Sequence, residues 1–249
     1  MEYWSQGGRR ISSDLALRVG MLVQQYDNLT GKTPEGEKFE CTLYLMALTT
    51  LLNQCAELTY DMTSELKKNG YEGREYDLNA DVYKCSGLWG GITKKSINED
   101  FGYKELKYSK LLRHMRNALA HPQDASGNSK YPQTGYTEIK DDSGKVNSFL
   151  LVTSPYTYKN GQLKSYDKKE QADKIIKDFF PPRNDISSKK ETNGKYRLYK
   201  GDELFVPSFQ VTISVQIMRE LVIKLSNYLG QPAQKHWDGV TIDELIRKE

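Results

Sequence analysis

The sequence predicts a mainly α-helical protein, a helical bundle that carries a small insertion of β-strands before its last long helix. Apolar residues recur at helical spacing through the first half of the 249-residue chain. After residue 132 this periodicity gives way to short alternating segments, and a strong helical pattern returns after residue 213. We therefore expect a single domain over 1–249, with a strand-containing insertion at 132–213 and a C-terminal extension at 230–249.

Two amphipathic helices are expected before residue 70. The first has apolar residues at spacings of four, seven and four, namely Ile11, Leu15, Leu22 and Tyr26. The second alternates steps of four and three over almost four heptads, through Cys41, Leu45, Leu48, Leu52, Cys55, Thr59, Met62 and Leu66. Because Pro34 suits a first helical turn and Asn69-Gly70 suits a helix end, this helix should span roughly 30 residues and about 45 Å.

The middle of the chain predicts a short helix, a longer helix and a β-hairpin. The short helix is expected near Ala80 to Leu88. The longer helix is expected from Tyr103 to His121, where Pro122 prevents its continuation. Strands at 137–140 and 146–153 flank a turn that contains aspartate and glycine.

The last third predicts a short helix at 171–180, a polar and mobile segment at 183–195, and a strand at 204–213. A long helix follows, with Ser214 as its cap and Gly230 at its end. Its broad apolar face can be covered only by the early helices, so we expect this helix to return to the bundle.

The composition and charge of the chain predict the cellular compartment and exclude some kinds of site. The three cysteines form no C-x-x-C pair and no cluster with histidine, so we expect buried thiols in a reducing compartment and no structural zinc. No apolar run reaches the roughly 20 residues that cross a bilayer, and no signal-peptide pattern opens the chain. The net charge of +3, from 36 basic and 33 acidic residues, neither requires nor forbids a nucleic-acid partner. We expect a cytoplasmic protein with no membrane partner.

One cluster of residues has the composition of a catalytic site, on the helix that ends before Pro122. At 100° per residue, the side opposite an apolar stripe carries Arg113, Arg116, Asn117 and His121. Asn117 has an i, i+4 neighbour on each side, Arg113 before it and His121 after it. The unpaired carbonyl groups at the helix end favour the protonated form of the imidazole.

These residue types can cleave RNA without a metal. The His121 imidazole can exchange a proton near neutral pH, either with the 2′-hydroxyl or with the leaving 5′-oxygen. The Arg116 guanidinium can bind the phosphate and offset charge that develops in the transition state. Asn117 can orient the histidine or the phosphate, and Arg113 can bind a further phosphate. Arginine and histidine five residues apart also occur by chance, so a basic, solvated helix end is the alternative interpretation.

The segment Arg116-Asn117-Ala118-Leu119-Ala120-His121-Pro122 resembles the Arg-x4-His signature of HEPN domains, helical nucleases of prokaryotic defence and toxin systems. The order of elements is also similar, with two long helices before the motif, then strands, then a late helix. This likeness of layout covers most of the chain, whereas the matching residues number about seven. The resemblance implies a homodimer that cleaves single-stranded RNA with Arg116 and His121 from both subunits, and with neither metal nor cofactor.

Two further comparisons with the HEPN pattern concern the site and its partners. Some HEPN toxins have a tyrosine two residues after the histidine, which a partner nucleotidyltransferase modifies, but this chain has Gln123 there. Another antitoxin or a defence-system partner stays compatible with the sequence. HEPN sites often recruit a polar residue from an earlier helix, for which the candidates are Asn53, Glu57 and Asp61. His114 lies outside the motif and is expected at the surface.

Three hypotheses about function compete. The first is an endoribonuclease, a toxin or an antiviral defence effector, in which the 2′-hydroxyl attacks its own phosphodiester. The second is a non-catalytic HEPN-like module that binds RNA, a nucleotide or a protein partner. The third is a helical scaffold with no role in nucleic-acid binding. The presence of both Arg116 and His121 favours the first, because a degenerate copy would be free to lose either residue.

Overall fold

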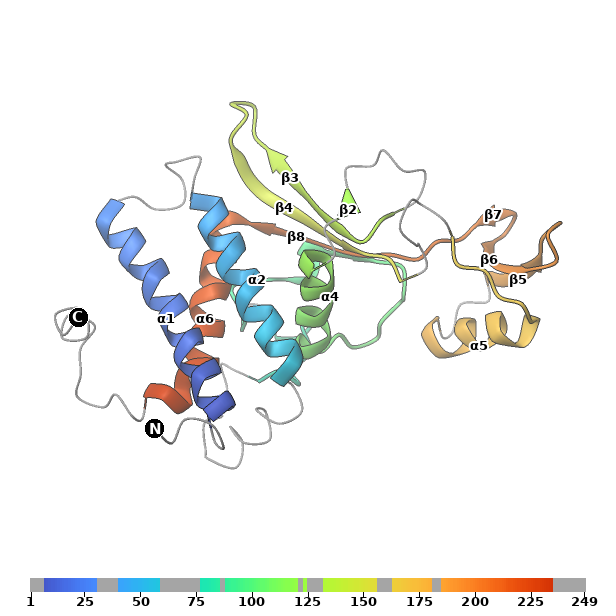
Figure 1. Cartoon of the computed structure of the whole chain (residues 1–249). Coiled ribbons are helices and arrows are strands. Elements are labelled where there is room, and N and C mark those ends of the chain that lie inside the picture. The colour runs from blue at the N-terminus through green and yellow to red at the C-terminus, as the bar shows by residue number, and fades with distance from the viewer. Residues whose placement is uncertain are drawn as a thin grey trace.

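The computed structural model describes residues 7–30, 40–58, 77–85, 88–120, 123–124, 132–155, 163–180 and 185–234. Its α-helices are α1 (Gly7–Thr30), α2 (Glu40–Leu58), α4 (Tyr108–Ala120), α5 (Lys169–Phe179) and α6 (Val215–Gln234). Its strands are β1 (Ile97–Glu99), β2 (Gln123–Asp124), β3 (Gly135–Lys140), β4 (Val146–Thr153), β5 (Ile186–Lys190), β6 (Tyr196–Lys200), β7 (Glu203–Leu204) and β8 (Phe209–Ser214). The predicted mainly helical class is therefore wrong, because the described residues form a mixed α/β fold with two sheets (Figure 1).

The larger sheet has five strands in the order β1-β8-β4-β3-β2. β8 is antiparallel to both of its neighbours, so Val211 lies opposite Ile97 of β1 and opposite Leu151 of β4. The sheet thus combines a strand that precedes α4 in the sequence with strands that follow it, and it is not an appendage to a bundle. β1 is only three residues long, with the sequence INE, so it has no alternation from which its pairing could be predicted.

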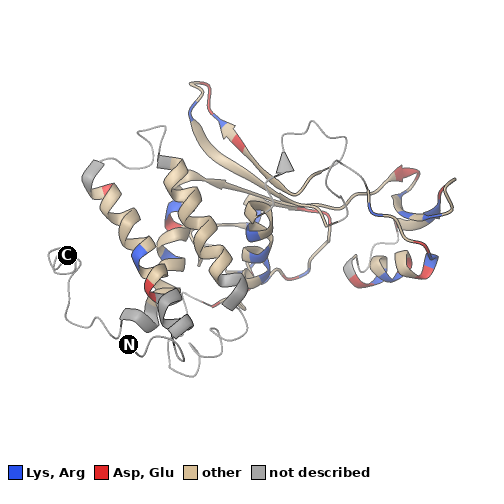
Figure 2. Ribbon diagram, viewed as in Figure 1, with Lys and Arg blue, Asp and Glu red and all other residues tan. Residues whose placement is uncertain are grey.

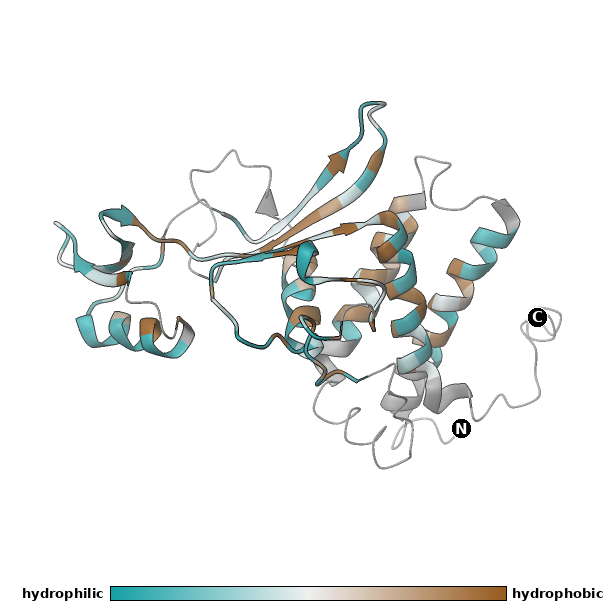
Figure 3. Ribbon diagram, turned by 180° about the vertical axis from the view of Figure 1, so that it is seen from behind, coloured by the Kyte–Doolittle hydropathy of each residue, from teal (hydrophilic) through white to brown (hydrophobic). Residues whose placement is uncertain are grey.

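The predicted hairpin is confirmed, since β3 and β4 pair antiparallel from Gly135 to Lys140. In its turn, the Asp141 carboxylate accepts hydrogen bonds from the backbone N–H groups of Ser143 and Lys145. Alternate residues of β4 and β8 belong to the same core as the helices: Phe149, Leu151, Phe209, Val211 and Ile213. Hydrophobic positions gather where these strands meet the helices (Figure 3). One face of the sheet is therefore part of the core.

Helix α6 returns to the early helices, as predicted, and packs along α1 and α2. The Ser226 hydroxyl donates a hydrogen bond of 2.6 Å to a backbone carbonyl of α1. Gly20 makes this approach possible, because a Cβ at that position would lie 2.0 Å from Ser226 Oγ. Asp27 of α1 accepts hydrogen bonds from Arg219 of α6 at 2.7 Å and from Tyr44 of α2 at 2.5 Å. These contacts fix the three helices relative to one another.

The segment before β1 is fixed against α6. Trp89 is fully buried and meets Tyr228 of α6 edge-on, with ring centroids 5.5 Å apart. Gly90 has φ +69°, and a Cβ there would lie 2.9 Å from the backbone nitrogen of Leu221. Only glycine combines this left-handed conformation with so close an approach.

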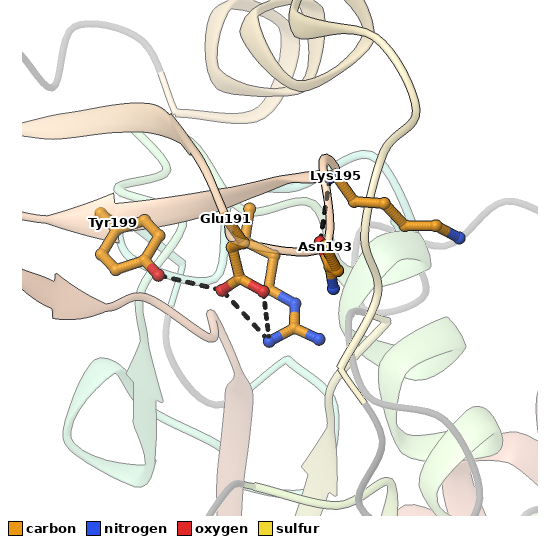
Figure 4. A network of polar contacts seen from close by, with 5 residues as sticks. Glu191, Asn193, Lys195 and Tyr199 are labelled. Atoms are coloured by element: carbon orange, nitrogen blue, oxygen red, sulfur yellow. Dashed lines mark hydrogen bonds and ion pairs between the residues drawn. The ribbon is translucent and has the colours of Figure 1, made fainter.

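A smaller unit lies beyond the five-stranded sheet and consists of α5 and the three-stranded sheet β5-β6-β7 (Figure 1). We call residues 163–206 the outer unit. Its β5–β6 hairpin is held by Glu191, which pairs with Arg197 at 3.0 Å and accepts a hydrogen bond from the Tyr199 hydroxyl at 3.0 Å (Figure 4). In the turn, Asn193 accepts a hydrogen bond from the backbone N–H of Lys195 at 2.9 Å.

An aromatic cluster joins the outer unit to the rest of the fold. It comprises Phe101, Tyr103, His114, Phe180, Phe205 and Phe209. Phe180, at the end of α5, stacks on Phe101 with centroids 5.5 Å apart and meets Phe205 edge-on at 5.5 Å. Because aromatic rings of the outer unit pack against rings of the rest of the fold, this packing, as well as the chain connections, determines the position of the outer unit.

The helix predicted near residues 80–88 is wrong, and the helix predicted over 103–121 is confirmed except for its start, because tertiary hydrogen bonds replace helical ones. Residues 80–85 form turns, and the buried Asp81 carboxylate accepts a hydrogen bond of 3.1 Å from the backbone N–H of Leu106. The same pairing takes up Leu106 and Lys107, so α4 begins at Tyr108, whose backbone N–H donates to the carbonyl of Ala80.

Two other boundaries also differ from prediction. The segment 183–195 contains β5, because its polar residues pair with β6, where Leu198 is buried. Helix α6 begins after the predicted cap, with the Ser214 hydroxyl accepting from the backbone N–H of Ile217, but it continues past Gly230 to Gln234. No helix among the described residues is long and apolar enough to cross a membrane.

Candidate functional site

Helix α4 carries the predicted motif and is held firmly at both its start and its middle. Its first turn is paired with residues 78–82, and the Tyr108 hydroxyl donates a hydrogen bond of 2.8 Å to the Cys85 carbonyl. Near its middle, the Thr153 hydroxyl of β4 donates a hydrogen bond of 2.9 Å to the His114 carbonyl. The helix therefore presents its polar side from a fixed position against the sheet.

The two sides of α4 differ as predicted. Its buried side consists of Tyr108, Leu111, Leu112, Met115, Ala118 and Leu119. The remaining surface carries Lys110, Arg113 and Arg116, and the helix has no acidic residue (Figure 2). The apolar stripe explains why this segment is helical and which side of it is left for a ligand.

The structure brings only some of the predicted site residues together. Arg113 is exposed and Asn117 is half-buried, and both line one cavity. Arg116 is half-buried and does not line that cavity, and its Nε is buried with no hydrogen-bond partner among the described residues. His121 and Pro122 lie outside the described residues. Of the two predicted catalytic residues, only Arg116 thus lies within the described structure.

The candidates from the earlier helix are not brought to this site. Asn53 of α2 is exposed and does not line the cavity. Glu57 has no described side chain, and Asp61 lies outside the described residues. Within the described ranges, no three histidine, cysteine or acidic side chains are grouped as metal ligands.

The cavity has a volume of about 430 Å³ and lies where α4, the segment after β1 and the outer unit meet. Its lining residues are Phe101, Tyr103, Ser109, Lys110, Arg113, His114, Asn117, Pro155, Lys164 and Ile175. Three of these are basic and none is acidic. Such a volume and such a charge suit a small anionic ligand or one unit of an anionic polymer.

The basic side chains of the cavity have no described carboxylate within ion-pair distance. Lys110, Arg113 and Lys164 form no ion pair within the described part of the chain. The Lys110 ammonium lies 3.7 Å from the centre of the Tyr103 ring, a cation–π contact. Partial burial lowers the pKa of Lys110, with a smaller opposite effect from Glu99 and a further lowering by Arg113.

His114 is not the surface residue that was predicted. Its ring stacks on Phe209 at a centroid distance of 4.0 Å, and it lines the cavity. Burial, assisted by the positive charges of Lys110 and Arg113, lowers the pKa of His114 from 6.5 to about 4. The imidazole is therefore neutral near pH 7 and cannot serve there as a proton donor of the imidazolium type. Its Nδ1 is buried without a hydrogen-bond partner among the described residues.

Several cavity residues were missed by sequence reasoning. Lys110 could have been found, because it precedes Arg113 by three positions and so shares its side of the helix. Lys164 could not, because it lies in the outer unit and more than 50 positions from Arg113 in the sequence. His114 was missed because a helical wheel shows angles around one helix and not what other segments place over it.

Comparisons with protein-family models, with curated proteins and with solved structures gave no significant match.

Proposed function

We propose that this protein is a metal-independent endoribonuclease that cleaves single-stranded RNA beside the C-terminal end of α4. Arg116 and His121 are the catalytic residues, Asn117 orients them or the phosphate, and Arg113 binds a neighbouring phosphate. One observation carries the proposal: the polar side of α4 carries Lys110, Arg113 and Arg116 without any acidic residue, and Arg113 and Asn117 on this side line a cavity. The resemblance of residues 116–122 to the HEPN signature supplies the reaction type.

The reaction is an internal transesterification. The 2′-oxygen forms a bond to phosphorus while the bond from phosphorus to the 5′-oxygen breaks. A base takes the proton of the 2′-hydroxyl, and an acid gives a proton to the leaving 5′-oxygen, so the products end in a 2′,3′-cyclic phosphate and a 5′-hydroxyl. His121 transfers protons, and Arg116 offsets the charge on the phosphorane-like transition state. His114 cannot replace His121 as the acid, because its lowered pKa keeps it neutral.

A shared site in a homodimer fits this chemistry. One chain offers one histidine in the motif, whereas the reaction proceeds best with a base on one oxygen and an acid on the other. A two-fold axis near the end of α4 would bring a second Arg116 and a second His121 to the same phosphate. An RNA target in the cell places the protein in the cytoplasm, where an antitoxin or a defence-system partner would restrain or trigger it.

The test is cleavage of labelled single-stranded RNA in excess chelator. Wild-type protein should give products with 2′,3′-cyclic phosphate ends, and His121→Ala should give none. Arg18→Ala, an exposed arginine of α1 paired with Asp14, is the matched surface control and should remain active. Activity that disappears in chelator and returns with magnesium or manganese would contradict the mechanism.

A second candidate is RNA binding without cleavage. It is favoured by the mixed α/β fold, which departs from the helical bundle that the resemblance implies. This candidate predicts that wild-type protein binds the labelled RNA and releases it intact, with and without added metal. Any cleavage that depends on His121 would exclude it.

A further inference from the structure

The cavity described above is lined by polar side chains that have no role in the proposed cleavage by Arg116 and His121. Lys110, His114 and Lys164 line it, and none of them belongs to the Arg-x4-His segment. The basic groups come from two separate parts of the fold, α4 and the outer unit. A cavity assembled in this way, with apolar walls and with cations that form no ion pair among the described residues, has the composition of a ligand site.

We propose that this cavity binds one nucleotide, with its phosphate held by Lys110, Arg113 and Lys164 and its base against the apolar side formed by Pro155 and Ile175. That the nucleotide belongs to an RNA strand rests on the proposed function. Binding of a nucleotide in the cavity does not, because it requires neither Arg116 nor His121.

The phosphate assignment follows from the charges. Lys110 and Arg113 are three positions apart on α4, so their side chains leave the helix on the same side. Lys164 faces the same cavity from the outer unit, where its ammonium is 5.8 Å from the Tyr166 ring and has no carboxylate partner among the described residues. Guanidinium and ammonium groups bind phosphate oxygens by charge-assisted hydrogen bonds.

The base assignment follows from the walls. Phe101 is not free to stack on a ligand, because Tyr103 and Phe180 stack parallel to it at 5.4 and 5.5 Å. It is a rigid wall, and the apolar space is bounded by Pro155 and Ile175 as well. Asn117 offers both a donor and an acceptor, which the edge of a base requires. The neutral His114 can contact the base only through Nε2, because its Nδ1 is buried. A volume of about 430 Å³ accommodates a ligand of this size.

In this proposal the outer unit forms part of the nucleotide-binding site. It supplies Lys164 and Ile175, and the aromatic cluster holds it against α4. Without the outer unit the cavity would lose one wall and one of its three basic groups. The strand-containing region would then be part of the binding site and not only a connection between α4 and α6.

The experiment measures binding of two probes to the full chain by titration calorimetry. The first probe is a nucleoside 5′-monophosphate, and all four of these are titrated in turn. The second probe is a 2′-O-methylated RNA tetranucleotide, which cannot be cleaved. The variants are Lys164→Ala and Lys110→Ala. Lys168→Ala is the matched control, since Lys168 is an exposed lysine of the outer unit that does not line the cavity. Thermal melting of each variant verifies folding.

Lys164→Ala and Lys110→Ala should each weaken binding of at least one probe by about tenfold, while Lys168→Ala should bind like wild type. For the tetranucleotide, loss of one phosphate contact should also reduce the slope of log K against log salt by about 0.7. Binding of the tetranucleotide alone assigns the cavity to a strand. Binding of a monophosphate alone assigns the cavity to a free nucleotide, which supports the nucleotide site and contradicts only its assignment to an RNA strand. Equal affinities in all four proteins, or no binding of either probe, would overturn the proposal.

Discussion

At the scale of single residues, the candidate site separates into groups that carry charge and groups that do not. Arg113 and Lys110 face the cavity as cations without described carboxylate partners, whereas His114 is held neutral between Phe209 and the same two cations. Arg116 has a buried Nε without a partner among the described residues, a cost that a structural arginine would avoid. A residue with a strongly shifted pKa that lines a cavity, as His114 does, is a candidate for a functional site.

The buried His114 should make stability depend on pH. Its pKa is lowered to about 4 in the folded protein but is near 6.5 when the chain unfolds, so the unfolded state binds more protons between these values. The stability contribution is complete above pH 6.5 and is lost as the pH falls towards 4, by about 3 kcal/mol at most. Denaturant unfolding at pH 7 and 4.5 should show a smaller loss for His114→Gln than for wild type. Equal losses in the two proteins would show that His114 titrates normally.

Arg116→Ala should reduce RNA cleavage at least about 100-fold, because it removes the group that offsets charge in the transition state. The melting temperature should change little, since Arg116 has no described hydrogen-bond partner to lose at Nε. Asn117→Ala should reduce the cleavage rate by only about tenfold, because it removes a residue that orients the catalytic groups or the phosphate but takes no part in proton transfer. Single-turnover cleavage rates and melting curves measure both effects. A large fall in melting temperature with normal cleavage by the folded fraction would make Arg116 a structural residue.

At the scale of elements, close approach between α1 and α6 depends on small residues. Gly20 and Ser226 lie so near each other that a Cβ on residue 20 would be 2.6 Å from Ser226 Cβ. The ion pair between Arg219 and Asp27 lies on the same pair of helices, at 2.6 Å. Packing of this kind is intolerant of added volume.

Gly20→Ala tests this packing, because two effects predict opposite signs. Alanine in a helix is intrinsically more stable than glycine by about 1 kcal/mol. Overpacking against Ser226 should outweigh that gain and lower the free energy of unfolding by about 1–3 kcal/mol. Ser226→Gly in the same chain should restore part of the loss. Urea unfolding of the two single variants and the double variant measures the coupling, and a stabilised Gly20→Ala would show that the helices can separate at no cost.

At the scale of the whole molecule, the fold leaves apolar side chains uncovered on its early helices. Leu15 and Leu22 of α1 are 44% and 55% exposed, and Met46 of α2 is 64% exposed. Isolated exposed apolar residues are common, but these three lie on two helices that pack against each other. They are the residues on which we test the proposed homodimer.

If the exposed apolar residues of α1 and α2 form the interface of the proposed homodimer, Leu22→Lys combined with Met46→Lys should give a folded monomer that no longer cleaves RNA, since a charge at an apolar contact is costly to bury. Ile139→Lys, at a 36% exposed apolar position of β3, is the matched control and should remain dimeric. Light scattering and cleavage assays measure both properties. A wild-type protein that is monomeric at working concentration and cuts RNA at full rate would exclude the shared site.

The sequence by itself determined the local features of this protein. The apolar stripe of α4, the β3–β4 hairpin and the cap of α6 at Ser214 were predictable, because side-chain periodicity and turn chemistry act over a few residues. The basic side of α4 was predictable for the same reason.

Only the tertiary structure decided the fold class and the cavity. The pairing of Ile97 with Val211 joins strands more than 100 residues apart in the sequence. A strand of three residues is too short to show the alternation of apolar and polar side chains from which its pairing could be predicted. Lys164 reaches the cavity through the packing of the outer unit, and His114 becomes neutral because Phe209 and Phe101 cover it. Long-range pairing and burial depend on all the segments that meet at a point, and no single segment of the sequence contains that information.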